Sequence, residues 1–287
     1  MIIAAFGQLV FWKDNKPNRY KGCVMMRSII FFDIDGTLMT EDDRMIIPDS
    51  TRNAIAETRS RGNLTFVNSG RTAFNISPKI KELGFDGYVC GCGTYIEYNG
   101  NVLLSSSLDQ EFCRKIAALC RECKVTPVYE HRDGYFFDYT LPITDDLRHF
   151  LDVFVDTGID VSRVVEDDEF AFDKFVIWVN PDSDKERFMN EVSKWFTIID
   201  RGNGFYENVP IGFSKATAID TLLDKLSISR NNAYAIGDSM NDLPMLESVP
   251  NSIAMGGAEQ LYPYVSYVTT NIENNGIYNA LRHYDLI

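Results

Sequence analysis

A run of large apolar side chains that leads straight into two aspartates is the feature that most constrains this sequence. The apolar residues are 29–32, and Asp33, Asp35 and Gly36 follow them. Because the apolar residues are continuous and do not alternate with polar ones, they predict a strand buried on both faces, as in a parallel sheet covered by helices. Burying a lone acid at the end of such a strand is costly. The two aspartates therefore indicate that this strand end serves chemistry.

Predicted strands and helices alternate at both ends of the chain. After the first strand, the expected elements are a helix over 49–61, a strand over 64–67, a helix over 72–84 that Pro78 interrupts or delays, a strand over 88–91, and a hairpin with Asn99 and Gly100 in its turn. The alternation resumes with a helix that Ser214 caps and a strand over 233–237. This order is typical of a parallel sheet.

The middle of the chain, residues 108–208, follows a different order of elements. Helices are expected over 108–123, 144–156 and 184–196, and strands over 125–130, 134–139, 174–179, 197–200 and 204–208. Helices and hairpin-linked strands in this order predict an α+β module with a largely antiparallel sheet. Because the parallel-sheet pattern resumes afterwards, the module is expected to be an insertion. Residues 26–107 and 209–287 would then form the core.

Composition and charge narrow the class of protein. The 287 residues carry 28 Lys and Arg against 41 Asp and Glu, a formal net charge of −13. This balance argues against nucleic acid as a partner, because nucleic-acid affinity rests on clustered basic residues. No apolar stretch reaches the ~20 residues that a membrane-spanning helix needs. We expect a cytoplasmic enzyme whose six cysteines are reduced and structural, and do not form zinc or dithiol sites.

Residues 1–25 are expected to be an N-terminal extension that the fold does not need. Their apolar part has no basic residue before it and no small-residue cleavage site after it, which argues against a signal peptide. Met25 and Met26 lie just before the first predicted strand. An ordered edge element is the alternative for this segment.

A second strand end brings further acids. A predicted strand runs into Asp238, and Asn241 and Asp242 lie on the following turn. Ligands of an open parallel sheet bind beyond the carboxyl ends of its strands, so these two aspartates are expected to converge with Asp33 and Asp35. Their mutual repulsion at low dielectric would be severe without a cation. A site made of carboxylate oxygens favours Mg²⁺.

Beside such a metal, the nucleophile that the sequence offers is a carboxylate. Asp33 is predicted to attack a phosphoryl group and form an aspartyl phosphate. Asp35, which faces the same way in an extended segment, would protonate the leaving oxygen and then deprotonate water. Gly36 permits the turn after them. Ser69, just past another strand end, and Lys215, in a first helical turn where a cation needs an anionic partner, are predicted to bind phosphoryl oxygens.

Four motifs, in this order, resemble those of the haloacid dehalogenase superfamily. They are "DIDGTL", "NSGR", "FSKATAI" and "GDSMNDLPML", with roughly a hundred residues inserted between the second and the third. The closest resemblance is to its Cof-type sugar-phosphate phosphatases with a large α/β cap, and it covers about residues 26–287. It implies an α/β fold, a Rossmann-like parallel-sheet core with an inserted α+β cap domain over 108–208.

The resemblance also implies roles for individual residues. Asp33 is implied to be the nucleophile and a Mg²⁺ ligand, Asp35 the acid/base and a ligand through its backbone carbonyl, and Asp238 a further ligand. Ser69, Lys215 and Asn241 are implied to bind phosphate. Residues expected to support the site are Gly36, Thr37, Gly70, Arg71 and Asp242.

The sequence departs from the family pattern at two places. Cys92 stands where relatives commonly have asparagine, which puts the choice of substrate in doubt. Asn68 and Ser69 stand in a motif where Thr-Gly-Arg is usual, but Ser69 keeps the hydroxyl.

Three alternatives stay open. A phosphosugar mutase would let a sugar hydroxyl, in place of water, intercept the intermediate, and a non-catalytic phosphometabolite-binding protein would use the same pocket without chemistry. Asn241 and Asp242 also fit a structural role, with Asp242 as the N-cap of a helix over 243–248. The expected function is hydrolysis of small phosphorylated metabolites, and the sequence specifies neither the ester nor the oligomeric state.

Overall fold

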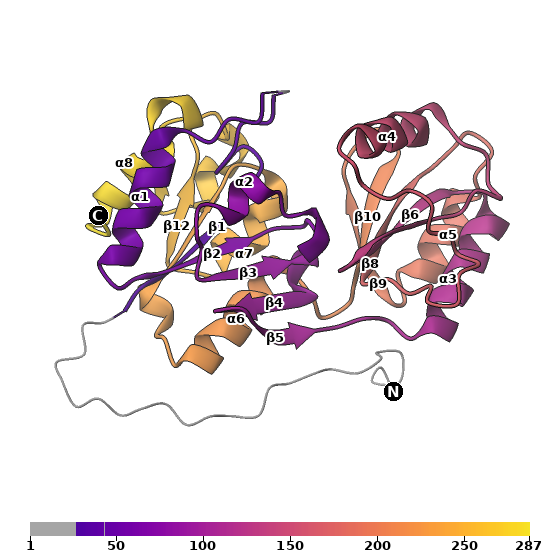
Figure 1. Cartoon of the computed structure of the whole chain (residues 1–287), viewed down its shortest axis with the longest axis horizontal. Helices are drawn as coiled ribbons and strands as arrows, with labels where there is room; N and C mark the ends of the chain where they lie inside the picture. The colour runs from indigo at the N-terminus through magenta and orange to yellow at the C-terminus, as the bar shows by residue number, and fades with distance from the viewer. Residues whose placement is uncertain (1–26, 43) are drawn as a thin grey trace. The chain divides into compact units, whose positions relative to one another are not determined.

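The computed structural model describes residues 27–42 and 44–287, so the predicted extension over residues 1–25 lies outside the described residues. The described chain divides into two compact units. The cap unit comprises Thr72–Asn75 and Leu104–Gly212. The core unit comprises the remaining described residues up to Arg71, together with Ile76–Leu103 and Phe213–Ile287 (Figure 1).

The core unit is built on an eight-stranded sheet, of which only the last two residues of one edge strand fall in the cap unit. In the order in which they lie side by side, its strands are β13 (Tyr267–Val268), β12 (Asn251–Ala254), β11 (Ala233–Gly237), β1 (Ile29–Phe32), β2 (Leu64–Asn68), β3 (Gly87–Cys90), β4 (Tyr95–Tyr98) and β5 (Asn101–Ser105). Neighbouring strands from β13 to β3 are parallel, and β4 is antiparallel to β3. This arrangement confirms the predicted α/β fold class with a parallel sheet.

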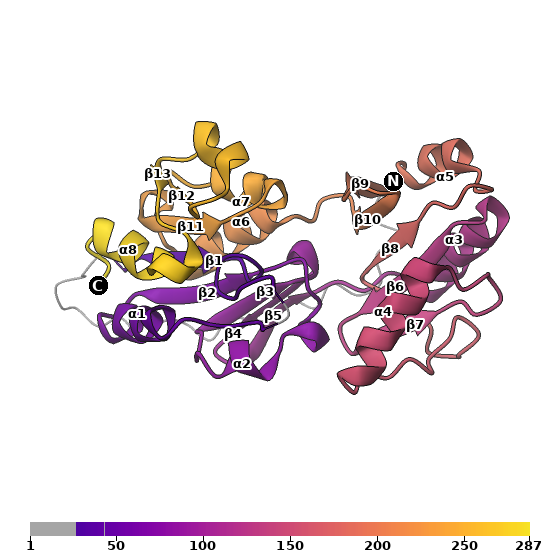
Figure 2. The same cartoon turned by 90° about the horizontal axis from the view of Figure 1, so that it is seen from above.

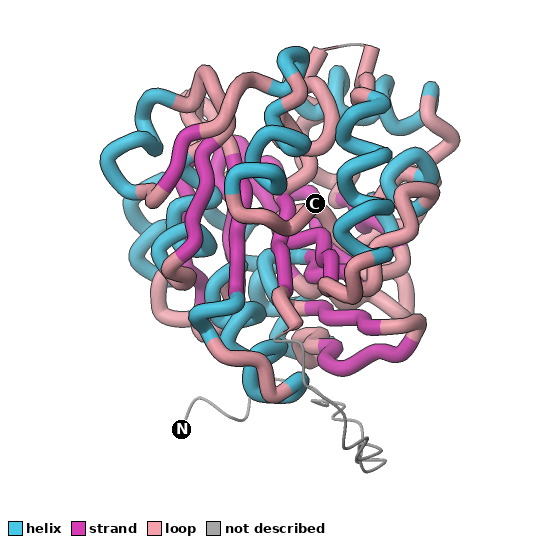
Figure 3. Tube along the Cα trace, turned by 90° about the vertical axis from the view of Figure 1, so that its left-hand side faces the viewer, coloured by secondary structure: helices cyan, strands magenta, loops and turns pink. Residues whose placement is uncertain are grey.

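Helices cover both faces of the core sheet (Figure 3). They are α1 (Asp49–Ser60), α2 (Pro78–Lys81), α6 (Lys215–Leu226), α7 (Leu243–Glu247) and α8 (Gly276–His283). Helix α1 packs against α8 and α6 packs against α7, and the two pairs lie on opposite sides of the sheet (Figure 2). Short 3₁₀ turns connect these elements at Ala73–Asn75, Gly91–Gly93, Arg230–Asn232, Met240–Asp242, Glu259–Tyr264 and Ile272–Asn274.

The sequence explains several of these elements directly. All four residues of β1 are completely buried, as a strand covered on both faces requires. Pro78 begins α2, so the helix predicted over 72–84 is split into a 3₁₀ turn and a short helix. Asn99 and Gly100 both have positive φ angles, 50° and 73°, as a two-residue hairpin turn demands.

The cap unit contains a five-stranded sheet. Its strands, in spatial order, are β7 (Gly134–Phe137), β6 (Thr126–His131), β8 (Lys174–Trp178), β10 (Phe205–Pro210) and β9 (Phe196–Asp200). All neighbouring pairs are antiparallel. The order of helices and hairpin-linked strands in the sequence predicted this type of sheet.

Three helices cover the two faces of the cap sheet (Figure 1). They are α3 (Gln110–Cys123), α4 (Asp145–Asp156) and α5 (Lys185–Val192). Phe175 and Ile177 of β8 pack beneath α3 and α5, whereas Val176 and Trp178 pack beneath α4. Among the described residues, no helix is both long and apolar enough to span a bilayer.

A second predicted helix is also shorter than expected. The helix predicted over 184–196 ends at Val192, and Phe196 instead begins β9. The side chain of Phe196 is 2% exposed in the core beneath α3 and α5, and its backbone pairs with Pro210. Strand pairing and burial therefore override the helical pattern of this segment.

Candidate active site

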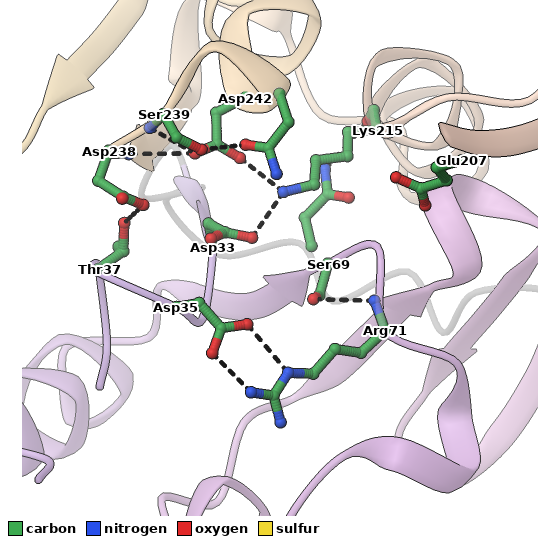
Figure 4. A network of polar contacts seen from close by, with 12 residues as sticks. Asp33, Asp35, Thr37, Ser69, Arg71, Glu207, Lys215, Asp238, Ser239 and Asp242 are labelled. Atoms are coloured by element: carbon green, nitrogen blue, oxygen red, sulfur yellow. Dashed lines mark hydrogen bonds and ion pairs between the residues drawn. The ribbon is translucent and has the colours of Figure 1, made fainter. Parts of the chain in front are cut away.

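Three neighbouring parallel strands end at the candidate site. Strand β1 lies between β2 and β11 and runs parallel to both. Asp33 follows β1, Ser69 follows β2 and Asp238 follows β11. Because the carboxyl ends of parallel strands meet at one edge of a sheet, these side chains belong to a single neighbourhood (Figure 4).

Three carboxylates meet at this edge. Asp33, Asp238 and Asp242 each offer an oxygen, and these oxygens all lie within 4.8 Å of one another. Burial raises the pKa of Asp33 to about 7; Asp242 adds to the rise, and Lys215 opposes it. Burial likewise raises the pKa of Asp238 to about 8, with contributions from Asp242 and Asp33. The cluster is therefore short of positive charge.

Lys215 supplies one positive charge within the cluster. Its Nζ donates hydrogen bonds of 2.5 Å to Oδ1 of Asp33 and 2.5 Å to Oδ1 of Asp242 (Figure 4). Burial by itself disfavours a charged ammonium, but the two carboxylates outweigh it and raise the pKa of Lys215 above its ordinary value. The predicted need of this lysine for an anionic partner is met by two aspartates.

Asp242 connects Lys215 to the loop after β11. Its Oδ2 accepts hydrogen bonds from the backbone N–H groups of Asp238 at 3.0 Å and Ser239 at 3.3 Å. The structural alternative for this residue is correct in part, because Asp242 orders the loop. Its side chain does not cap α7, however, and its other oxygen holds the ammonium.

Two residues of the first motif shape the surroundings of Asp238. Thr37 donates a hydrogen bond of 3.0 Å from Oγ1 to Oδ1 of Asp238. Gly36 has a φ of +72°, and a Cβ at this position would lie 2.2 Å from Oδ2 of Asp238. Glycine at this position therefore permits the positive φ of the turn and leaves room for the Asp238 carboxylate.

The carboxylate of Asp35 is not among the three whose oxygens lie within 4.8 Å of one another, and it has a partner of its own. It accepts hydrogen bonds from Arg71, at 3.0 Å from Nε and 2.5 Å from Nη2 (Figure 4). Asp35 is predicted to converge with the other acids; its carboxylate is not one of the three in the cluster, but its charge contributes to the raised pKa of Asp33. The arginine supplies a bidentate partner that draws the carboxylate to itself.

The remaining predicted residues lie in two loops. The Ser69 hydroxyl accepts a hydrogen bond of 3.2 Å from the backbone N–H of Arg71, so Gly70 lies within a tight turn. Oδ1 of Asn241 accepts a hydrogen bond from the Ser239 hydroxyl. Sequence reasoning missed several hydrogen bonds, among them that of Arg71 with Asp35 and that of Asn68 with the backbone of α6. No local pattern signals either.

Comparison with known proteins places the chain in a family. The family model of haloacid dehalogenase-like hydrolases matches residues 30–281. YkrA of Bacillus subtilis (strain 168), provisionally named a phosphatase, is 28% identical over 285 residues, and the match covers 92% of this chain and 100% of YkrA. YcsE of the same strain, named a 5-amino-6-(5-phospho-D-ribitylamino)uracil phosphatase, is 26% identical over 262 residues, covering 90% of this chain and 96% of YcsE.

A solved structure shows the same fold. The structure of BT4131, described as a sugar phosphatase of subclass IIB, superposes with a TM-score of 0.75 at 24% identity and covers 91% of this chain and 100% of BT4131. The two curated relatives are named as phosphatases, which agrees with the hydrolase family of the matching model. Because the family model spans nearly all of the described residues, this chain belongs to the haloacid dehalogenase-like hydrolases.

Proposed function

We propose that this haloacid dehalogenase-like phosphatase hydrolyses monoesters of small phosphorylated metabolites, with Asp33 as nucleophile and Mg²⁺ as cofactor. The observation that carries the proposal is the contact of the buried Lys215 ammonium with Asp33 at 2.5 Å, beside two further carboxylates. A carboxylate held by a cation at strand ends is suited to attack an anionic phosphoryl group. The names of YcsE and BT4131 support phosphorylated metabolites as the substrate class.

The residues present fit a hard divalent cation. The cluster offers only oxygen ligands, as Mg²⁺ prefers. Both oxygens of Asp242 already accept hydrogen bonds, so Asp33 and Asp238 are the side chains better placed to be direct ligands. The backbone carbonyl of Asp35 is proposed as a third. Bound there, Mg²⁺ would neutralise charge on the cluster and on the phosphoryl oxygens.

Asp33 and Asp35 have separate roles in the proposed reaction. Asp33 attacks phosphorus, the bond to the ester oxygen breaks, and Asp35 donates a proton to the departing alkoxide. A water molecule next attacks the phosphorus of the aspartyl phosphate while Asp35 takes its proton, which releases inorganic phosphate and regenerates Asp33. Ser69, Lys215 and Asn241 are proposed to hold the phosphoryl oxygens.

A substrate panel tests this function. Phosphate release should be measured with Mg²⁺ from sugar phosphates, phosphorylated cofactors and p-nitrophenyl phosphate. We expect turnover of several small monoesters, with a marked preference among them. If no ester in the panel loses phosphate faster than it does with the Asp33→Asn variant, the proposed hydrolase function is wrong.

Replacing Asp35 with asparagine should affect esters according to their leaving groups. Loss of a general acid should slow hydrolysis of alkyl phosphates about 10²- to 10⁴-fold. p-Nitrophenolate leaves without a proton. With p-nitrophenyl phosphate, formation of the aspartyl phosphate should therefore keep its rate, while hydrolysis of the aspartyl phosphate should be slow. Rapid mixing should then show a burst of nitrophenolate equal to the enzyme concentration. Equal losses on both kinds of ester, without a burst, would contradict the role of Asp35.

Replacing Gly36 with alanine should impair activity more than folding. The added Cβ would displace the Asp238 carboxylate, and a displacement of about 1 Å can cost about 10²-fold in rate. The matched control is Gly100→Ala, because Gly100 has a similar φ of +73° and, apart from its chain neighbours, no residue has an atom within 4 Å of the place that its Cβ would take. Both variants should lose about 1–3 kcal/mol of stability from backbone strain, but only Gly36→Ala should lose activity.

We also propose that residues 108–208 form an inserted cap domain that selects the substrate. Limited proteolysis tests the boundaries, because early cleavage is expected in the segments near residues 108 and 208. A cytoplasmic location and the absence of nucleic-acid partners are further proposals, supported by the net charge of −13.

A further inference from the structure

A buried amide at the end of β2 holds the first turn of α6, the turn that carries Lys215. Asn68 is the last residue of β2 and is completely buried. Its Nδ2 donates a hydrogen bond of 3.0 Å to the backbone carbonyl oxygen of Lys215, 147 positions away in the sequence. The side chain thus connects the strand that precedes Ser69 to the helix that carries the ammonium.

Lys215 has a particular need for a fixed backbone. Its ammonium must reach Asp33 and Asp242 from the N-terminal end of a helix, where the helix dipole opposes a positive charge. The side chain is long and has several rotatable bonds, so its head group is located only as well as its base is. A hydrogen bond on the carbonyl of the same residue fixes that base.

The loop after β3 also links the end of β2 to the start of α6. Gly93 lies so close to the helix start that a Cβ on it would be 2.5 Å from the carbonyl oxygen of Ser214. The backbone N–H of Cys92 donates a hydrogen bond of 3.2 Å to the carbonyl oxygen of Ser69. The loop after β3 therefore contacts both the residue before Lys215 and the residue after Asn68.

The amide oxygen of Asn68, Oδ1, indicates why this residue is polar. Among the described residues, Oδ1 of Asn68 has no hydrogen-bond partner. Turning the amide over would bring this oxygen against the carbonyl oxygen of Lys215, so the N–H bond sets its orientation. An apolar side chain would avoid burying an unpaired oxygen. The bond to Lys215 is the contribution that an apolar residue could not make.

We propose that Asn68 is a positioning residue that fixes Lys215 relative to Ser69, so that the ammonium and the hydroxyl meet the same phosphoryl group. This inference rests on the proposed function. It assigns a role to a residue at which the sequence departs from the family pattern. Asn68 acts only through Lys215, and its removal should therefore matter only while Lys215 is in place.

The first test compares kinetic constants. Asn68→Ala and the volume-matched Asn68→Leu should each lower kcat/KM about 10- to 100-fold, the usual cost of misplacing a catalytic group. Asn68→Asp should be worse, because its carboxylate would face the Lys215 carbonyl oxygen. The matched control is Asn251→Ala, which loses amide bonds of 2.9 and 3.0 Å to backbone carbonyls elsewhere in the core unit. It should leave kcat/KM within about twofold. Unchanged kcat/KM in both Asn68→Ala and Asn68→Leu would overturn the proposal.

A double-mutant cycle tests whether Asn68 affects kcat/KM through Lys215. In a Lys215→Arg background, which keeps the charge but changes its position, Asn68→Leu should cost less than about threefold, because the positioned group is already displaced. In the wild-type background it should keep its full effect. Equal losses in the two backgrounds would show that Asn68 acts elsewhere and would overturn the proposal.

Hydrogen exchange measures the same contact without relying on activity. Backbone amides of residues 216–220, at the start of α6, should exchange faster in Asn68→Leu than in wild type, and at the wild-type rate in Asn251→Ala. Unchanged exchange in Asn68→Leu would overturn the inference. A chain that hydrolyses no ester would refute the proposed function, whereas the exchange result would still decide whether Asn68 fixes the helix start.

Discussion

Replacing Asp33 with asparagine should reduce hydrolysis of every phosphate monoester by at least about 10⁴-fold while the chain stays folded. Asparagine has nearly the same shape and can still accept a hydrogen bond from Lys215, so the local geometry should survive. An amide is a poor nucleophile and a poor ligand for a hard cation, so the proposed intermediate could not form. Initial rates with Mg²⁺ measure the loss of hydrolysis, and circular dichroism and thermal unfolding show whether the variant stays folded.

The control for this variant is Asp220→Asn. Asp220 lies in α6 of the core unit, and its exposed carboxylate pairs with Arg230. Removing that charge should leave the rate within about twofold, because exposed ion pairs contribute little. Acid quenching during turnover, followed by mass spectrometry, should find a phosphoryl group on the peptide that contains Asp33 in wild type and none in Asp33→Asn. Substantial activity in Asp33→Asn, or an adduct on another residue, would refute Asp33 as nucleophile.

Chelation of divalent cations should abolish activity, and added Mg²⁺ should restore it. The three carboxylates whose oxygens lie within 4.8 Å of one another hold one ammonium among them, so the cluster needs another positive charge before an anionic ester can approach. Asp238→Asn removes one proposed ligand and should raise the Mg²⁺ concentration for half-maximal activity by at least about tenfold. Titration of the chelated enzyme with Mg²⁺ gives this concentration directly.

Calorimetry with Mg²⁺ alone separates binding from catalysis. Wild type and Asp220→Asn should bind the ion with equal affinity, and Asp238→Asn should bind it more weakly. Ca²⁺ should restore little activity, since it favours more ligands at longer distances than Mg²⁺ does. Full activity in excess chelator would rule out the proposed cofactor. An unchanged Mg²⁺ requirement in Asp238→Asn would remove Asp238 from the set of proposed ligands.

The parts of the fold and site that follow from the order of strands could be predicted. The continuous apolar run at 29–32 specifies a central strand, and the carboxyl ends of parallel neighbours share one edge. The meeting of Asp33 with Asp238 therefore follows from two local patterns. The contact of Lys215 follows as well, because a cation in a first helical turn needs an anion nearby.

The remaining features depend on side-chain contacts between distant segments. Thr37 meets Asp238 across 201 positions, and Arg71 reaches Asp35 from a different strand end. Such contacts depend on exact strand offsets and rotamers, which hydrophobic periodicity does not specify. The early end of α5 at Val192 has a similar cause, because pairing of Phe196 with Pro210 competes with a continuing helix.

The position of β1 in the core sheet has a consequence for synthesis of the chain on the ribosome. Its two neighbours differ in when they are made: β2 follows within a few dozen residues, whereas β11 begins at Ala233. Until β11 emerges, one side of this wholly apolar strand has no backbone partner, and open strand edges invite association between nascent polypeptides. Chaperone capture of the growing chain should therefore persist until β11, which ends at Gly237, has emerged from the ribosome.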